Sequence, residues 1–272
     1  MEPLAPHPFE RVVIVGRGLI GGSIALAAAE RLPRTTVITV DRGDDIRSAA
    51  GADLVVLATP IGQILELLPV LAALVSGTTV VTDTGSTKSA IVNAAPGGMR
   101  FIGGHPIAGA AVSGVAGARA DLFTGRPWIL TPSATAEPTH LAGLQHFVES
   151  LGARPQLLDA EEHDRLFAFL SHLPQLVVSA LMDVVGSHVG ADGLALAGPG
   201  LRDTTRLASS PPGIWRDIVR TNDVQVRNAL DDLISLLTTL RDDSSGEALA
   251  ETFARAARWK EMVDGIYHPR SG

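Results

Sequence analysis

The chain has 272 residues, and its 22 Lys and Arg against 29 Asp and Glu give a formal net charge of −7. Hydrophobic residues make up 46% and charged residues 19% of the chain, which supplies a buried core and excludes a disordered protein. A negative chain without a run of Lys and Arg is a poor match for nucleic acid or an anionic membrane as its main partner.

Cysteine is absent, so disulfides, thiol nucleophiles, iron–sulfur clusters and thiolate metal sites are excluded. The eight histidines are scattered, and we predict no metal site. The first residues lack a basic segment followed by an apolar one, so we expect no secretory signal. Uncharged stretches such as 67–82 fall short of the ~20 residues of a membrane helix. We therefore expect a cytoplasmic protein.

The first half alternates short β-branched runs with longer segments rich in Ala and Leu. The runs are continuously apolar, which is typical of parallel strands covered on both faces. Strand–helix alternation predicts an α/β fold with a doubly wound, Rossmann-type parallel sheet. The predicted strands are 12–16, 36–41, 54–60, 79–84, 100–106, 128–131 and 155–158, and the helices between them are 19–32, 61–75, 87–95 and 141–151.

From about residue 160 onward the sequence predicts only helices. They cover 161–185, 193–209, 213–221 and 223–260. We place a domain boundary near Asp159, which divides the chain into residues 1–159 and 160–272.

The last predicted helix carries an apolar stripe that another helix must cover. The covering helix belongs either to the same domain or to a second copy of the chain. We predict a homodimer through the helical domain. The stripe consists of Val226, Leu230, Leu233, Leu237 and Leu240.

A G-x-G-x-x-G motif follows the first predicted strand and opens the next helix. Gly16 permits the tight turn, Gly18 lets the backbone approach a pyrophosphate, and Gly21 lets helix and strand pack closely. Together with Leu19 and Ile20, these residues predict a dinucleotide cradle at the positive end of the helix dipole.

Two further strand ends complete the predicted cofactor site. Asp41 lies 20 positions after Gly21, where a carboxylate binds ribose hydroxyls and repels a 2′-phosphate, so NAD is favoured over NADP. Arg42 beside it could stack on adenine or accept a phosphate. Thr59 and Pro60 end another strand on the same side of the sheet.

Polar residues without an obvious core role follow two more strands. Ser86 lies in the segment 82–88, and His105 lies in the glycine-rich segment 103–109. A neutral imidazole beside a nicotinamide is suited to accept a proton during hydride transfer.

The chain resembles the prephenate and arogenate dehydrogenases of tyrosine biosynthesis. Five motifs occur in that family's order: GRGLIGGS (16–23), DTGSTK (83–88), GGHPIAG…SG (103–114), HDRLFAFLSHLP (163–174) and GLRDTTRLA…WRDI (200–218). The resemblance implies oxidative decarboxylation of a cyclohexadienyl acid with NAD⁺. It also implies that the reaction is driven largely by aromatisation, with the protein supplying orientation and electrostatics.

The resemblance assigns roles by position. His105 accepts the proton of the substrate's 4-hydroxyl group, and Ser86 orients His105 and that hydroxyl. Arg206 pairs with a substrate carboxylate, because a guanidinium binds both oxygens. Arg202 and Arg216 are competitors for that role.

The helix around Pro174 carries two predicted pocket residues, His172 and Gln175, which lie three apart on one face. Packing within the helical domain is the other interpretation of His172. Many prephenate-using relatives have His where this chain has Gln175, and some carry Glu in the loop 110–112 where this chain has Ala-Ala-Val. These departures leave prephenate and arogenate both open, with prephenate preferred.

His163 and Asp164, near a helix start, are interpreted as structural.

Two rival hypotheses remain. A β-hydroxyacid dehydrogenase would need a catalytic Lys in the helical domain, where Lys260 is the sole lysine. A non-catalytic dinucleotide-binding homologue would leave His105 and Arg206 unconnected.

Overall fold

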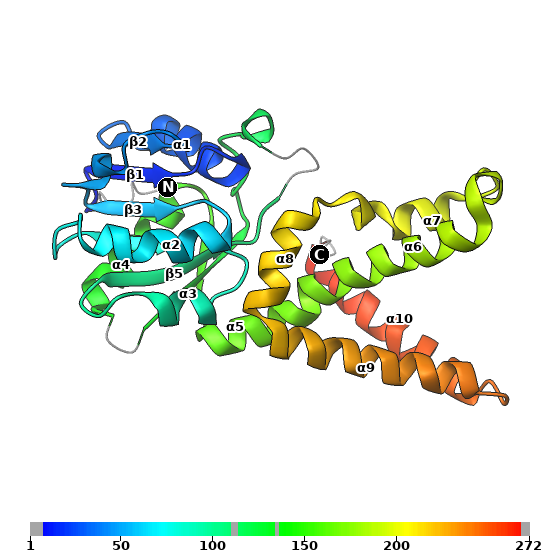
Figure 1. Cartoon of the computed structure of the whole chain (residues 1–272). Coiled ribbons are helices and arrows are strands. Elements are labelled where there is room, and N and C mark those ends of the chain that lie inside the picture. The colour runs from blue at the N-terminus through cyan, green and yellow to red at the C-terminus, as the bar shows by residue number, and fades with distance from the viewer. Residues whose placement is uncertain (1–7, 110–113, 134–135, 268–272) are drawn as a thin grey trace, which may run out of the picture. The chain divides into compact units, whose positions relative to one another are not determined.

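The computed structural model describes residues 8–109, 114–133 and 136–267. The first part of the chain builds a seven-stranded sheet (Figure 1). Its strand order is β2-β1-β3-β4-β5-β6-β7. Strand β2 lies on one side of β1, and β3 and the later strands lie on the other side. The point between β1 and β3 is therefore the switch point of a doubly wound sheet. The strands are β1 (Arg11–Val15), β2 (Thr36–Val40), β3 (Leu54–Leu57), β4 (Val80–Asp83), β5 (Arg100–Pro106), β6 (Pro127–Pro132) and β7 (Arg154–Leu157).

Helices cover both faces of this sheet because its strands alternate between two apolar sets. Val12 and Ile14 join a core with α1 (Leu19–Arg31) and α4 (Pro138–Ser150). Val13 and Val15 join a second core with α2 (Ile61–Ala72) and α3 (Ser89–Ala94). The predicted doubly wound architecture is confirmed.

The sequence predicts a parallel sheet, but one pair of strands in it is antiparallel. Strand β5 pairs with β6 in antiparallel fashion, with His105 opposite Ile129. A parallel pair needs a crossover segment, usually an α-helix. In the described residues of the β5–β6 connection, the structure has a 3₁₀ turn, η2 (Val115–Gly117), and no α-helix.

After the sheet the described chain is helical, as predicted, but with different bounds. The predicted helix 161–185 is divided into α5 (Ala160–Phe167), a π-helical turn η3 (Ala168–His172) and the start of α6 (Leu173–Leu194). The predicted helix 193–209 is broken into α7 and the 3₁₀ turn η4. The remaining bounds are η1 (Ile46–Ala49), α7 (Pro199–Thr204), η4 (Arg206–Ser209) and α8 (Pro212–Thr221).

The residues up to Gln225 form one compact unit, so α5 to α8 belong with the sheet. Asp217 of α8 accepts a hydrogen bond from the Gly62 backbone at the start of α2, at 3.1 Å. Ile218 joins the core that α2 and α3 cover. The predicted domain boundary near Asp159 stays a prediction.

The residues from Val226 onward form a second unit. The predicted single helix 223–260 is wrong, because α9 (Asp223–Asp242) and α10 (Glu247–Tyr267) are separated by a turn. Asp243 stabilises that turn by accepting hydrogen bonds from the backbones of Ser245, Gly246 and Leu249. Gly246 has a φ of 79°, which glycine adopts without strain.

One helical stretch, Ala160–Leu194, is long and apolar enough to cross a membrane by length and composition alone. At 35 residues it is longer than the uncharged stretches, such as 67–82, on which the expectation of no membrane helix was based. Its first turns contain His163 and Asp164, which are buried. His163 is hydrogen-bonded to His105 of β5, and Asp164 to Ser89 of α3. Those bonds attach that end of the stretch to the sheet, and the absence of a membrane partner stays a prediction.

Candidate functional site

The glycine motif forms a tight turn between β1 and α1. A Cβ atom on Gly16, whose φ is 105°, would lie 2.5 Å from the Ala58 carbonyl oxygen, and one on Gly21 would lie 1.9 Å from that of Gly16. At Gly18, by contrast, a Cβ atom would meet nothing within 4 Å. The first N–H groups of α1 have no partner inside the helix, so the turn presents an open surface that an anion can approach.

The predicted ribose carboxylate, Asp41, follows β2 and is half exposed. Its Oδ2 lies 3.5 Å from Arg17 Nε, an ion pair that the sequence analysis did not anticipate. Its Oδ1 accepts a hydrogen bond from the Arg42 backbone at 2.8 Å. Arg17 also donates a hydrogen bond to Asp44 at 3.2 Å. Because Arg17 is paired with Asp41 as well, a ribose bound at Asp41 would share the Asp41 carboxylate with Arg17.

Thr59 and Pro60 lie where β3 passes into α2, beside the glycine turn. The Thr59 hydroxyl is buried and has no hydrogen-bond partner among the described residues. Its methyl group would lie 3.0 Å from a Cβ atom on Gly16. An unpaired buried hydroxyl at the switch point is what a bound nucleotide could satisfy, so these residues fit a dinucleotide.

His105 lies near the end of β5, partly buried. Its Nδ1 is 2.8 Å from His163 Nε2 on α5, and its ring centroid is 4.9 Å from that of Phe167. Burial, followed by the neighbouring His163, Lys88 and His172, holds the pKa of His105 well below its usual value. The imidazole is therefore neutral near pH 7 and able to accept a proton.

Ser86 lies in the loop between β4 and α3, and its side chain is half-buried. No hydrogen bond joins it to His105 in the part of the chain that the structure describes, where the His105 Nδ1 atom is held by His163. The orienting role of Ser86 stays a prediction.

Beneath this loop lies a fully buried ion pair between Lys88 and Asp83. The Lys88 ammonium also donates to the Gly104 carbonyl at 2.7 Å, and Asp83 Oδ1 accepts the Gly104 N–H at 3.0 Å. Both backbone groups of the residue preceding His105 are thus fixed. Burial lowers the pKa of Lys88, while the Asp83 charge raises it.

His172 is buried, and its Nε2 atom has no hydrogen-bond partner among the described residues. Its Nδ1 lies 3.3 Å from Asn222 Nδ2, and its ring stands edge-on to Trp215 at 6.3 Å. Burial lowers the pKa of His172 to about 4, against the opposing effect of Asp164. A buried, neutral ring is consistent with the predicted pocket role, which stays a prediction.

Gln175 is buried with its amide in use. Its Nε2 donates to Ser179 and to the Leu207 carbonyl, at 3.1 and 2.8 Å, and its Oε1 accepts from Ser210 at 3.0 Å. These bonds connect α6 to η4, where Arg206 lies. A direct substrate contact by Gln175, which stays a prediction, would compete with them.

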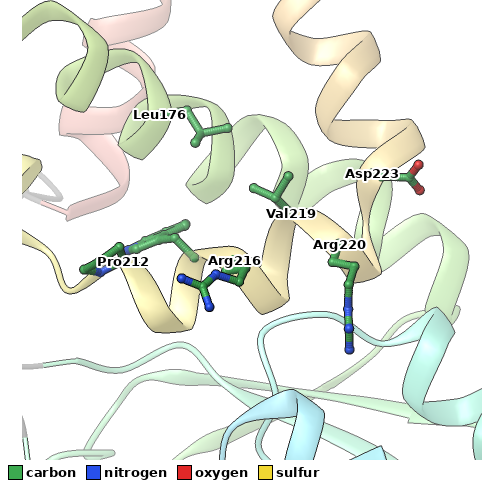
Figure 2. Close-up of a pocket in the computed structure, with 7 residues that line it drawn as sticks. Leu176, Pro212, Arg216, Val219, Arg220 and Asp223 are labelled. Atoms are coloured by element: carbon green, nitrogen blue, oxygen red, sulfur yellow. The ribbon is translucent and has the colours of Figure 1, made fainter. Parts of the chain in front are cut away.

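Arg206 begins η4 and is exposed, and no ion pair is formed by it within the described residues. Two other arginines, Arg216 and Arg220 on α8, line a hollow of about 640 Å³. Figure 2 shows their guanidinium groups extending from the helix. The other residues that line the hollow are Leu176, Pro212, Trp215, Val219 and Asp223.

Two family models match consecutive parts of the chain. Residues 19–157 match the nucleotide-binding domain of prephenate dehydrogenase, and residues 159–255 match its dimerization domain. The chain belongs to the prephenate dehydrogenase family.

Individual relatives agree with this assignment. Prephenate dehydrogenase of Bacillus subtilis is 32% identical over 94% of this chain and 76% of its own. The A. aeolicus prephenate dehydrogenase, solved with hydroxyphenyl propionate and NAD⁺, superposes with a TM-score of 0.86 at 27% identity, covering 94% of this chain and 98% of that one. Synechocystis arogenate dehydrogenase has a TM-score of 0.76 at 31% identity, covering 92% and 99%.

In this member of the prephenate dehydrogenase family, the contact between His105 and the pair His163–Asp164 is not predicted from the sequence. The two histidines are 58 residues apart, and neither spacing nor composition connects them. The one available signal was the adjacency of His and Asp at a helix start, which alone favours a structural interpretation. The loop 110–112 lies outside the described residues.

We predict that Gly18→Ala leaves the fold intact and weakens dinucleotide binding. The added methyl group meets no protein atom but occupies the surface that a pyrophosphate approaches. The Kd for NADH, measured by fluorescence titration, should rise about tenfold or more, which corresponds to ~1.4 kcal/mol. Gly77→Ala, also in open space, is the matched control, and an unchanged Kd for Gly18→Ala would place the cofactor elsewhere.

We predict that Lys88→Met strongly destabilises the protein, because it leaves the buried Asp83 carboxylate without its counter-charge. The free energy of unfolding in urea should fall by about 3–5 kcal/mol. Lys260→Met, which breaks an exposed pair with Asp264, is the control and should leave the transition in place. Equal stability of the two variants would contradict a structural role for the buried pair.

Proposed function

We propose that the protein is an NAD-dependent prephenate dehydrogenase, which converts prephenate into 4-hydroxyphenylpyruvate and carbon dioxide in tyrosine biosynthesis. The observation that carries the proposal is His105, a neutral imidazole at the carboxyl end of a strand in the nucleotide-binding sheet. The relatives and solved structures of the family support the same reaction.

The residues that would hold the cofactor are those of the glycine turn and the neighbouring strand ends. Gly16, Gly18, Leu19, Ile20 and Gly21 would face the pyrophosphate. The adenosine ribose would lie against Asp41 and Arg42, and the nicotinamide half against Thr59 and Pro60. A bound NAD⁺ would supply the hydride acceptor for the ring carbon that carries the 4-hydroxyl group.

His105 supplies the acid–base chemistry. Its ring accepts the proton of the 4-hydroxyl group as that oxygen becomes a carbonyl oxygen. Loss of carbon dioxide then gives an aromatic phenolate, to which the protonated ring can return the proton. Ser86, in the neighbouring loop, would orient His105 and the hydroxyl group.

Arg206 would bind a substrate carboxylate, and its exposed guanidinium is available for that purpose. Arg216, which lines the hollow on α8, and Arg202 are the alternatives. His172 and Gln175 would lie at the pocket wall. We prefer prephenate, whose side chain is a keto acid, because arogenate carries an ammonium group that needs an acidic partner. The two acidic residues near His105 are Asp83 and Asp164, and both are already bonded to protein groups.

Arogenate dehydrogenase is the alternative function, favoured by the 31% identity with the Synechocystis enzyme. A non-catalytic dinucleotide-binding homologue is a further one.

We propose a cytoplasmic homodimer whose partners are small molecules, and neither nucleic acid nor membrane. The match to a dimerization domain over residues 159–255 supports assembly through the helical region, and we keep residues 1–159 and 160–272 as the functional division. In the predicted stripe, Val226 is buried and Leu237 is 55% exposed. Leu237 and exposed apolar side chains of α10, such as Phe253 and Trp259, are suited to a partner copy.

We predict that NADH forms fastest with prephenate and NAD⁺ when prephenate and arogenate are each assayed with NAD⁺ and NADP⁺. His105→Ala should lower kcat by about 10²–10⁴-fold, because it removes the proton acceptor, and leave the Kd for NADH unchanged. Unaltered turnover would reject His105. A preference for arogenate would select the alternative enzyme, and inactivity of the native protein with both acids would leave a nucleotide binder.

We predict that the acid limb of the kcat/KM profile lies below pH 6.5. The base acts when deprotonated, and burial with the nearby His163, Lys88 and His172 lowers its pKa. Activity should therefore persist as the pH falls below the ordinary histidine value and be lost only through the lowered pKa. An acid limb at or above 6.5 would contradict a desolvated His105.

A further inference from the structure

Three buried side chains form a chain of hydrogen bonds that ends at His105. His163 Nε2 lies 2.8 Å from His105 Nδ1, and His163 Nδ1 lies 2.9 Å from Asp164 Oδ1. His163 is fully buried and Asp164 is 3% exposed. Asp164 Oδ1 also accepts the Lys88 N–H at 2.7 Å, and its Oδ2 accepts the Ser89 N–H at 2.9 Å.

The protonation of this chain follows from its acceptor end. Burial alone would raise the pKa of Asp164, but hydrogen bonds from His163 and from the Lys88 and Ser89 backbones outweigh burial and lower it. An ionised carboxylate only accepts, so the Nδ1 of His163 carries the hydrogen and its Nε2 is a bare acceptor. The Nδ1 of His105 must then carry the hydrogen that joins the two rings, and its Nε2 is left with a free lone pair.

We propose, on the basis of the function proposed above, that His163 and Asp164 are positioning residues that fix His105 in the tautomer whose Nε2 accepts the substrate's proton. The other tautomer of His105 would place a hydrogen on Nε2 and could not act as the base. When Nε2 takes up the proton, the resulting imidazolium already donates through Nδ1 toward the Asp164 charge.

Neighbouring groups restrict the alternatives. The Phe167 ring stacks on His163, with a centroid distance of 4.4 Å and an interplanar angle of 21°, and also contacts His105. This packing restricts rotation of both rings. The buried Lys88 ammonium disfavours a proton on either ring in the resting protein.

A purely structural role must be separated from this one, because Asp164 also joins α5 to the start of α3. Two substitutions of His163 make that separation. His163→Gln retains an acceptor for the His105 N–H, whereas His163→Phe fills the space beside Phe167 without one.

The first experiment compares kcat, KM and the Kd for NADH in these two variants. His163→Phe should lower kcat about 100-fold or more with little change in KM or in the Kd, and His163→Gln should keep kcat within about tenfold of the native value. Melting temperatures control for folding. Equal losses of kcat in both variants, or a loss confined to KM, would overturn the positioning role.

The second experiment does not depend on activity. Histidine ¹⁵N NMR is recorded on the folded, ¹⁵N-labelled protein, and His105 is assigned by the resonances that are missing in His105→Ala. The spectrum should show the Nδ1 of His105 protonated and its Nε2 without a hydrogen. His163→Phe should turn this single tautomer into a mixture. If the native protein oxidises neither cyclohexadienyl acid but shows this tautomer, the proposed function fails and the positioning role stands. A hydrogen on Nε2 in the native protein would overturn the positioning role itself.

Discussion

The carboxylate of Asp164 is the group on which the site depends. It accepts the Lys88 and Ser89 N–H groups and thereby attaches α5 to the start of α3. The same carboxylate accepts a hydrogen bond from His163, whose other nitrogen holds His105. One buried charge therefore both docks the first helical segment on the sheet and determines how the imidazole is presented. A buried carboxylate is retained only where such bonds compensate its desolvation, so packing and acid–base chemistry are coupled at this point.

The sheet brings the other half of the site to the same edge. The carboxyl ends of β1 and β3 lie at the switch point of the sheet, where the glycine turn leads into the N-terminus of α1. Strands β4 and β5 continue that edge toward His105. The buried pair of Lys88 and Asp83 fixes both backbone groups of Gly104, so the strand that presents His105 has little freedom to shift. A rigid strand end beside a nucleotide cradle is the geometry that hydride transfer needs.

The sequence predicts those parts of the molecule that local rules govern. The strands, the glycine turn and the position of His105 at a strand end follow from β-branched runs and from spacing. The antiparallel β5–β6 pair could not be predicted, since apolar runs carry no strand direction. The turn at Asp243 was hidden by the helical composition on both sides of it. The bond between His105 and His163 depends on how α5 docks on the sheet, which no local pattern encodes, and the engagement of Gln175 with η4 is another tertiary contact of this kind.

The central claim is that His163 acts on the reaction only through His105. A double-mutant cycle tests it most directly, with kcat measured for His105→Ala, His163→Phe and the double variant. If the claim is right, the double variant has the same kcat as His105→Ala within about twofold, because no proton acceptor remains to be oriented. If the two losses multiply, His163 contributes to turnover independently of His105, and its role as a positioning residue is contradicted.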